Sequence, residues 1–147
     1  MAKPIVAVTM GDPAGVGPEV VLKALADPVV RKACHPLVLG DWEVLHRTRN
    51  RQSRYPRLVP WEWGKPVAEN GGSVPVHCLS FLTPKQSRPG HLSKACGEAS
   101  YRYIRAAAEL VLAEVADAMA TAPISKRALQ LAGYRYPGHT ELLAELT

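Results

Sequence analysis

The sequence has few cysteines and no long apolar run, and each shortage excludes a class of protein. Its three cysteines, Cys34, Cys78 and Cys96, show no Cys-x-x-Cys spacing, which argues against a disulfide framework and against a zinc knuckle. The apolar stretches fall far short of the roughly 20 residues that span a bilayer. The first of them is broken at Gly11-Asp12-Pro13, so it is too short for the core of a signal peptide. We therefore expect a cytoplasmic protein with reduced thiols and no membrane partner.

Aromatic residues make up only 6% of the chain, which weakens a nucleic-acid interpretation of the net charge of +5. The positive charge is concentrated between Arg47 and Arg57, where Tyr55 is the interleaved aromatic residue. A solvated helix end and loop explains such a run better than an RNA-binding surface. We expect no nucleic-acid partner and keep a small basic RNA-binding or scaffold protein as the non-enzymatic alternative.

The first half of the chain alternates between strand and helix patterns. A β-branched run at residues 4–10 predicts a buried strand, and a helix follows from Pro18 until Asp27-Pro28 stops it. A second strand is expected at residues 35–40, before a helix that Asp41 can cap. Further strands are expected at residues 58–61 and 74–79, separated by the turn-rich segment 70–73 and followed by an exposed loop at 83–90.

The second half repeats this alternation. Ser93 can cap a long helix to about Val115, because apolar residues recur there at intervals of three and four. A strand is expected at residues 116–122 and a helix at 125–132. The chain stops within a further helix that begins near residue 138, as a truncated chain would, and a short docked terminal helix is the alternative. Repeated strand-helix pairs predict an α/β fold whose mostly parallel sheet is flanked by helices and binds ligands at the carboxyl ends of its strands.

Three segments combine turn residues with polar side chains at such strand ends. The first, residues 10–19, holds three glycines that permit close backbone approach to an anionic or polar ligand. It lacks the spacing of a P-loop or of a dinucleotide fingerprint, so a tight structural turn remains an equal alternative. In the second, Thr121, Ser125 and Lys126 could meet a phosphate or a carboxylate, although Ser125 also suits a plain helix cap and Lys126 a surface position.

The third segment is Tyr136-Pro137-Gly138-His139-Thr140-Glu141, a turn before a helix. His139 could donate a hydrogen bond to a substrate oxygen or exchange a proton with it, and Thr140 adds a hydroxyl at the helix start. The alternative is a histidine satisfied by the backbone and a threonine that caps the helix. The five histidines are scattered without the short spacings of zinc ligands, so we assign no metal-binding residue.

Four stretches together resemble the family of 4-hydroxythreonine-4-phosphate dehydrogenases, the PdxA family. They read VTMGDPAGVGPEVVLKAL at positions 8–25, GHLSKACGEASYRYI at 90–104, ATAPISKRAL at 120–129 and YPGHTELLAEL at 136–146. Their order and spacing agree with the family across nearly the whole chain. The resemblance implies that residues 1–147 are the N-terminal portion of a two-domain αβα dehydrogenase, related in fold to isocitrate and isopropylmalate dehydrogenases.

The resemblance also implies the chemistry. Members oxidise the secondary alcohol of 4-phosphohydroxy-L-threonine with NAD or NADP, and the β-keto acid product decarboxylates to 3-amino-2-oxopropyl phosphate on the route to pyridoxal phosphate. A divalent ion, zinc, magnesium or cobalt, binds the substrate through ligands expected downstream of this chain, and the enzyme is a homodimer. Related branches act on 4-phosphorylated threonate or erythronate, or on a dihydrodiol of an aromatic acid, and these remain alternatives.

Residue by residue, the resemblance assigns substrate binding to His139 and Thr140, which match the family's His-Thr pair. Gly11, Asp12 and Gly15 match its opening loop and are expected to shape the cleft. No catalytic residue is assigned and the residues that bind the nicotinamide cofactor remain unknown. We expect residues 1–147 alone to be inactive.

Overall fold

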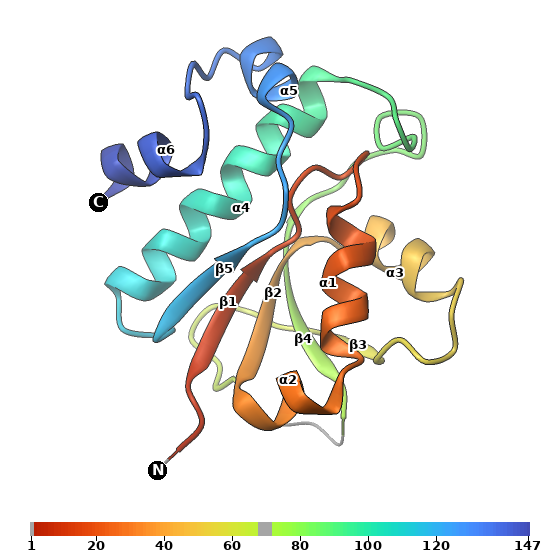
Figure 1. Ribbon diagram of the computed structural model, residues 1–147, viewed down its shortest axis with the longest axis vertical. Coiled ribbons are helices and arrows are strands. Elements are labelled where there is room, and N and C mark those ends of the chain that lie inside the picture. Colours follow the sequence, from red (N-terminus) through yellow and green to blue (C-terminus); the bar gives the residue numbers. More distant parts are fainter. Residues whose placement is uncertain (1, 68–71) are drawn as a thin grey trace.

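The computed structural model of the protein describes residues 2–67 and 72–147 as helices packed on both faces of one sheet (Figure 1). Within these residues the sheet has five strands in the order β3-β4-β2-β1-β5, and every neighbouring pair is parallel. The predicted α/β class with a parallel, helix-flanked sheet is thereby confirmed.

Strand bounds follow the apolar runs of the sequence. The strands are β1 (Ile5–Thr9), β2 (His35–Asp41), β3 (Leu58–Pro60), β4 (Val74–Ser80) and β5 (Ala118–Thr121). Next to the β5 edge of the sheet, Val8 of β1 pairs with Val38 of β2 on one side and with Ala120 of β5 on the other. Of the turn expected at residues 70–73, Asn70 and Gly71 lie outside the described residues.

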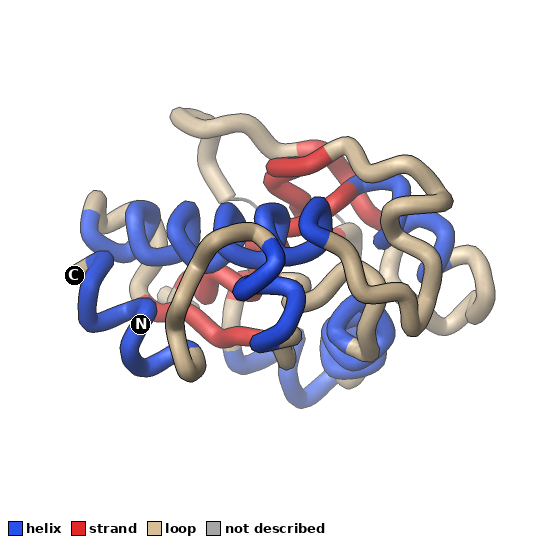
Figure 2. Tube along the Cα trace, turned by 90° about the horizontal axis from the view of Figure 1, so that it is seen from above, coloured by secondary structure: helices blue, strands red, loops and turns tan. Residues whose placement is uncertain are grey.

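Two groups of helices cover the two faces of the sheet (Figure 2). The first group is α1 (Gly17–Leu25), α2 (Pro28–Ala33) and α3 (Trp42–Arg49), and the second is α4 (Lys94–Leu112), α5 (Lys126–Leu131) and α6 (His139–Leu146). α1 contacts α2 and α3, whereas α4 packs on the sheet and carries α5 and α6. Across residues 2–67 and 72–147, no helix is both long enough and apolar enough to cross a bilayer.

The long helix α4 forms where its cap and its apolar face predict it, but it ends earlier. The Ser93 hydroxyl accepts a hydrogen bond from the Cys96 amide at 3.1 Å, as expected of the cap. The helix was expected to continue to about Val115 and stops at Leu112. The reason is that Glu114 takes a positive φ of 59°, which breaks the helical hydrogen-bond pattern.

The short helix α2 was not predicted. The Asp27-Pro28 pair does end α1 near Leu25, as expected, but it also starts a new helix. The Asp27 carboxylate accepts from the Val29 amide at 2.8 Å, and Pro28 supplies the first helical residue, a position at which its lack of an N–H costs nothing. The Asp27-Pro28 pair thus ends α1 and begins α2.

The basic run is partly used inside the fold. Arg47 of α3 donates to the Ser87 hydroxyl at 3.3 Å and to the Ser87 carbonyl oxygen at 3.2 Å. Ser87 is buried, although it lies in the segment 83–90 that was expected to form an exposed loop. The arginine that starts the basic run therefore anchors a loop.

An apolar groove of about 260 Å³ runs beside β5, which lies at an edge of the sheet and, among the described residues, pairs with β1 alone. Its walls come from β1, β5, α1 and α2, and the residues that line it are Val6, Val8, Val20, Val21, Ala24, Leu25, Val30, Cys34, Ala120, Thr121 and Ala122. Val20 remains 46% exposed. Exposed apolar surface next to an unpaired strand edge favours association with further protein.

We expect the isolated 1–147 polypeptide to self-associate or to bind a hydrophobic dye, because this groove and the free edge of β5 lie open to solvent. Dye fluorescence and sedimentation of the polypeptide test this, with a full-length version as the control that should bind less dye. A monomer that unfolds cooperatively and binds no dye would contradict the expectation.

Candidate active site

The carboxyl ends of β1 and β5 lie side by side and their chains then diverge. β1 pairs with β5 up to Thr9 and Thr121. After β1 the chain passes to α1 on one face of the sheet, whereas after β5 it passes to α5, which packs on α4 on the other face (Figure 1). In open parallel sheets, ligands bind where neighbouring connections diverge in this way. We therefore expect a ligand-binding site at the carboxyl ends of β1 and β5.

The glycine-rich loop after β1 packs directly on the chain that leaves β5. Gly11 has a φ of +75°, and a side chain there would overlap the Pro123 carbonyl oxygen. The same oxygen accepts a hydrogen bond from the Asp12 amide at 3.0 Å. A side chain at Gly17 would overlap the Met10 carbonyl oxygen. Two of the three glycines are thus required for close backbone packing, which supports the structural interpretation of this loop.

Asp12 organises the loop from within. Its carboxylate accepts from the Ala14 amide at 3.0 Å, and its carbonyl oxygen accepts from the Gly15 amide at 3.0 Å. Burial raises the pKa of the Asp12 carboxyl above its usual 3.8, and the bond from Ala14 opposes that rise. Asp12 therefore holds the turn that Gly15 completes, and its role in shaping a cleft stays a prediction.

His139 starts α6 and reaches the end of β5. Its imidazole is hydrogen-bonded to the Ala122 backbone, while its Nε2 atom is buried without a partner. Burial lowers the pKa of His139 below 6.5, and the Ala122 bond offsets part of that effect. A neutral imidazole carries one donor and one acceptor nitrogen, so the unpartnered Nε2 is a polar atom still able to form a hydrogen bond. Such an atom can accept a proton or a hydrogen bond from a substrate hydroxyl.

Thr140 lies exposed in the first turn of α6. It does not cap the helix, because Gly138 occupies the capping position and no side chain bonds to the first amides. The interpretation of Thr140 as a plain helix cap is therefore wrong. Its hydroxyl and the uncapped first-turn amides of α6 remain available to a ligand.

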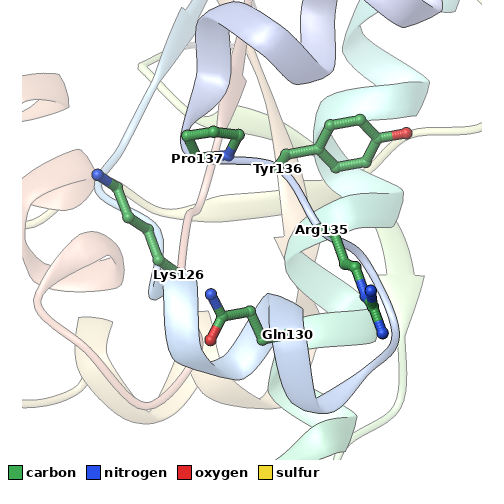
Figure 3. A pocket seen from close by; sticks show the side chains of 5 residues that line it. All are labelled: Lys126, Gln130, Arg135, Tyr136 and Pro137. Atoms are coloured by element: carbon green, nitrogen blue, oxygen red, sulfur yellow. The ribbon is translucent and has the colours of Figure 1, made fainter.

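The second predicted segment divides into a cap and a basic side chain. The Ser125 hydroxyl accepts from the Ala128 amide at 3.1 Å and is the N-cap of α5, so the interpretation of Ser125 as a plain helix cap is confirmed. Lys126 lines a pocket of about 510 Å³, whose other walls come from Gln130, Arg135, Tyr136 and Pro137 (Figure 3). The Lys126 and Arg135 side chains point to different sides of this pocket, so they do not converge on one small anion (Figure 3).

A buried polar cluster lies at the carboxyl ends of β2 and β4. The sequence predicted the helix cap in this cluster but not its other hydrogen bonds. Asp41 caps α3 through Val44, as expected, but its second carboxylate oxygen accepts from the Ser80 hydroxyl and the Leu82 amide, each at 2.8 Å. Ser80 also lies 2.6 Å from the Tyr103 hydroxyl, and burial raises the pKa of that phenol. No periodicity signals these bonds, since Tyr103 fits the apolar face of α4 equally well.

The described residues offer no group of three or more histidine, cysteine, aspartate or glutamate side chains that could hold a metal ion. Metal sites in proteins are built from such clusters. The side chains that this structure describes therefore do not by themselves fit the divalent ion that the resemblance implies.

Comparison with known proteins decides the family. Residues 32–147 match the model of the family described as pyridoxal phosphate biosynthetic protein PdxA. The chain belongs to the PdxA family. The match includes α4, the end of β5 and the His139-Thr140 pair, so the family assignment made from the four sequence stretches is confirmed.

Two curated relatives show how far the similarity extends. The chain is 50% identical over 145 residues to a 4-hydroxythreonine-4-phosphate dehydrogenase of Trichlorobacter lovleyi, covering 98% of this chain and 43% of that protein. It is 39% identical to a D-threonate 4-phosphate dehydrogenase of Cupriavidus necator, again over 98% of this chain and 43% of that protein. The chain therefore spans less than half the length of these PdxA-family relatives.

A solved structure confirms the architecture. The crystal structure of a 4-hydroxythreonine-4-phosphate dehydrogenase from Burkholderia phymatum superposes with a TM-score of 0.88 at 39% identity. The superposition covers 99% of this chain and 44% of that chain. The parallel sheet and its flanking helices are thus the arrangement found in the corresponding part of a PdxA-family structure.

Proposed function

We propose that this chain is the N-terminal portion of a two-domain, homodimeric PdxA-family dehydrogenase, and that His139 and Thr140 bind its phosphorylated hydroxy-acid substrate. The observation that carries the proposal is the buried, unpartnered Nε2 of His139 beside the diverging ends of β1 and β5. The relatives named dehydrogenases support the reaction class.

The reaction proposed is NAD(P)-dependent oxidation of the secondary alcohol of 4-phosphohydroxy-L-threonine, followed by decarboxylation to 3-amino-2-oxopropyl phosphate. The nicotinamide would supply hydride transfer, and the divalent ion that the family implies would be held by residues expected downstream of this chain. In this chain, the Nε2 lone pair of His139 would accept from a substrate hydroxyl and so orient it, while Thr140 adds a hydroxyl at the uncapped start of α6. We propose a cytoplasmic location for this reaction.

The second candidate is oxidation of a 4-phosphorylated threonate, which the 39% identity to the D-threonate 4-phosphate dehydrogenase of Cupriavidus necator favours. Both substrates carry a phosphate and a secondary alcohol, and they differ at the carbon that bears the amino group or a hydroxyl.

Steady-state kinetics of a full-length version separate the candidates. We expect the kcat/KM for 4-phosphohydroxy-L-threonine to exceed that for 4-phospho-threonate and 4-phospho-erythronate by tenfold or more, because a site built around one polar group rejects the analogue that lacks it by about that factor at least. NAD and NADP are compared with each substrate. A preference for phospho-threonate would establish the second candidate, and activity only on an aromatic dihydrodiol would contradict both.

A further inference from the structure

We propose that Tyr134 is a positioning residue for His139: stacked on Tyr101 and hydrogen-bonded to Glu98, it fixes the segment that brings the imidazole to the end of β5. Tyr134 itself lies five residues before His139 and acts through it. This inference rests on the proposed function of His139.

The contacts of Tyr134 join the segment between α5 and α6 to the long helix α4. Its ring lies on that of Tyr101 with centroids 3.9 Å apart and planes 11° apart, a stacked arrangement. Its hydroxyl donates to Glu98 at 3.2 Å, and its amide donates to the Leu129 carbonyl oxygen at 2.9 Å. Tyr101 and Glu98 both belong to α4, whose opposite face is buried, so Tyr134 is attached to a rigid element.

A second anchor holds the chain on the other side of His139. Leu142, three residues further on, is fully buried, and α6 packs on α4. Tyr136 adds a hydrogen bond to Glu145 within α6, which ties the connecting segment to that helix. His139 therefore lies between two attachments to one helix, and its imidazole extends from this span to the Ala122 backbone.

Removing the stack between Tyr134 and Tyr101 is expected to change substrate binding as well as stability. The segment 133–138 has no helix or strand of its own, so loss of the Tyr134 anchor frees the span up to Leu142. A displacement of about 1 Å in a group that orients a substrate is enough to weaken its contact severely. A tyrosine with a purely structural role would lower the melting temperature and leave substrate kinetics unchanged.

Kinetics of the full-length protein provide the first test. We expect Tyr134→Leu, which removes the stack, to raise the KM for the phosphorylated substrate about tenfold with kcat changed less than about twofold. Tyr134→Phe keeps the ring and loses only the bond to Glu98, so a smaller rise is expected. Tyr55→Leu is the matched control, because Tyr55 is buried and precedes β3 at the opposite edge of the sheet from β5; it should lower the melting temperature without changing KM.

A double-mutant cycle separates action through His139 from a general effect. In the His139→Ala background, Tyr134→Leu should change KM by less than about twofold, because the group that it positions is gone. Equal effects of Tyr134→Leu in both backgrounds would overturn the proposal. If His139→Ala leaves KM unchanged, the proposed substrate role of His139 fails, which is a different result.

An NMR titration of the His139 ring in the ligand-free, full-length protein tests the positioning without any substrate. In the wild type, burial holds the pKa of His139 below 6.5. In Tyr134→Leu we expect that pKa to return toward 6.5, because the freed span exposes the ring to water. An unchanged His139 pKa in that variant would overturn the proposal even if KM had risen.

Discussion

His139→Ala in a full-length version is expected to lower kcat/KM for the phosphorylated substrate about ten- to a thousandfold, on the order of 1.5–4 kcal/mol. The variant removes the Nε2 atom that is buried without a partner at the end of β5. Because the fold holds the imidazole in place, truncating His139 to alanine removes its entire contact with the substrate. The measurement is steady-state kinetics with substrate and cofactor varied separately, and the KM for NAD should barely change.

Two further variants of His139 show which of its ring nitrogens is responsible for the expected loss of kcat/KM. His139→Asn places its amide near the Nδ1 position and leaves nothing at Nε2, so its kcat/KM should be as low as that of His139→Ala. His139→Gln places its amide near Nε2 and should recover part of the activity. Thr140→Val should act in the same direction as His139→Ala but less strongly, and Thr140→Ser should be mild. Intact kinetics with a lower melting temperature in His139→Ala would identify a structural histidine.

Gly97→Ala is expected to destabilise the protein by about 3 kcal/mol, although helix propensity alone predicts the opposite sign. In an exposed helix interior, alanine is more favourable than glycine by about 1 kcal/mol. Gly97 lies buried in α4, and a side chain there would overlap the Ala128 carbonyl group of α5. Because both partners are backbone, neither can move aside as a flexible side chain would. The overlap therefore outweighs the propensity.

Denaturant unfolding of the full-length protein measures this change. Gly15→Ala is the matched control, because its nearest neighbour is the Asp12 side chain of its own loop, 3.3 Å away, and its φ is not positive. We expect that control to change the free energy of unfolding by less than about 1 kcal/mol. A Gly97→Ala variant as stable as the wild type would show that α4 and α5 can separate at no cost, which contradicts the close packing described here.

Local patterns were sufficient for most elements of this fold. The β-branched run before Gly11 formed β1, and the predicted caps Asp41, Ser93 and Ser125 each accept the expected amide. These predictions held because a cap and an apolar period depend on residues within one turn of each other. The two places where the helices differ from the prediction also have local causes. The turn at Glu114 shortened α4, and Asp27 started the helix α2.

The candidate site was predicted in part, from the family motif rather than from spacing. His139 and Thr140 were selected because they match the family's His-Thr pair, and their role in binding substrate stays a prediction. Spacing alone favoured a histidine satisfied by the backbone, and the structure shows one such bond, to Ala122, together with a free Nε2. The contact of Tyr134 with Glu98 had no signal in the sequence, because tyrosine and glutamate 36 residues apart follow no period.

By itself, the sequence determined the parallel α/β class, most of the strands and helices, the capping residues and the family, because each of these depends on neighbouring residues or on whole motifs. Only the tertiary structure decided which glycines are required, which of Asp41's oxygens serve the cap and which serve Ser80, and what His139 faces. The physical reason is range: these contacts join segments that are distant along the chain, and they form only after the sheet has brought the ends of its strands to one edge.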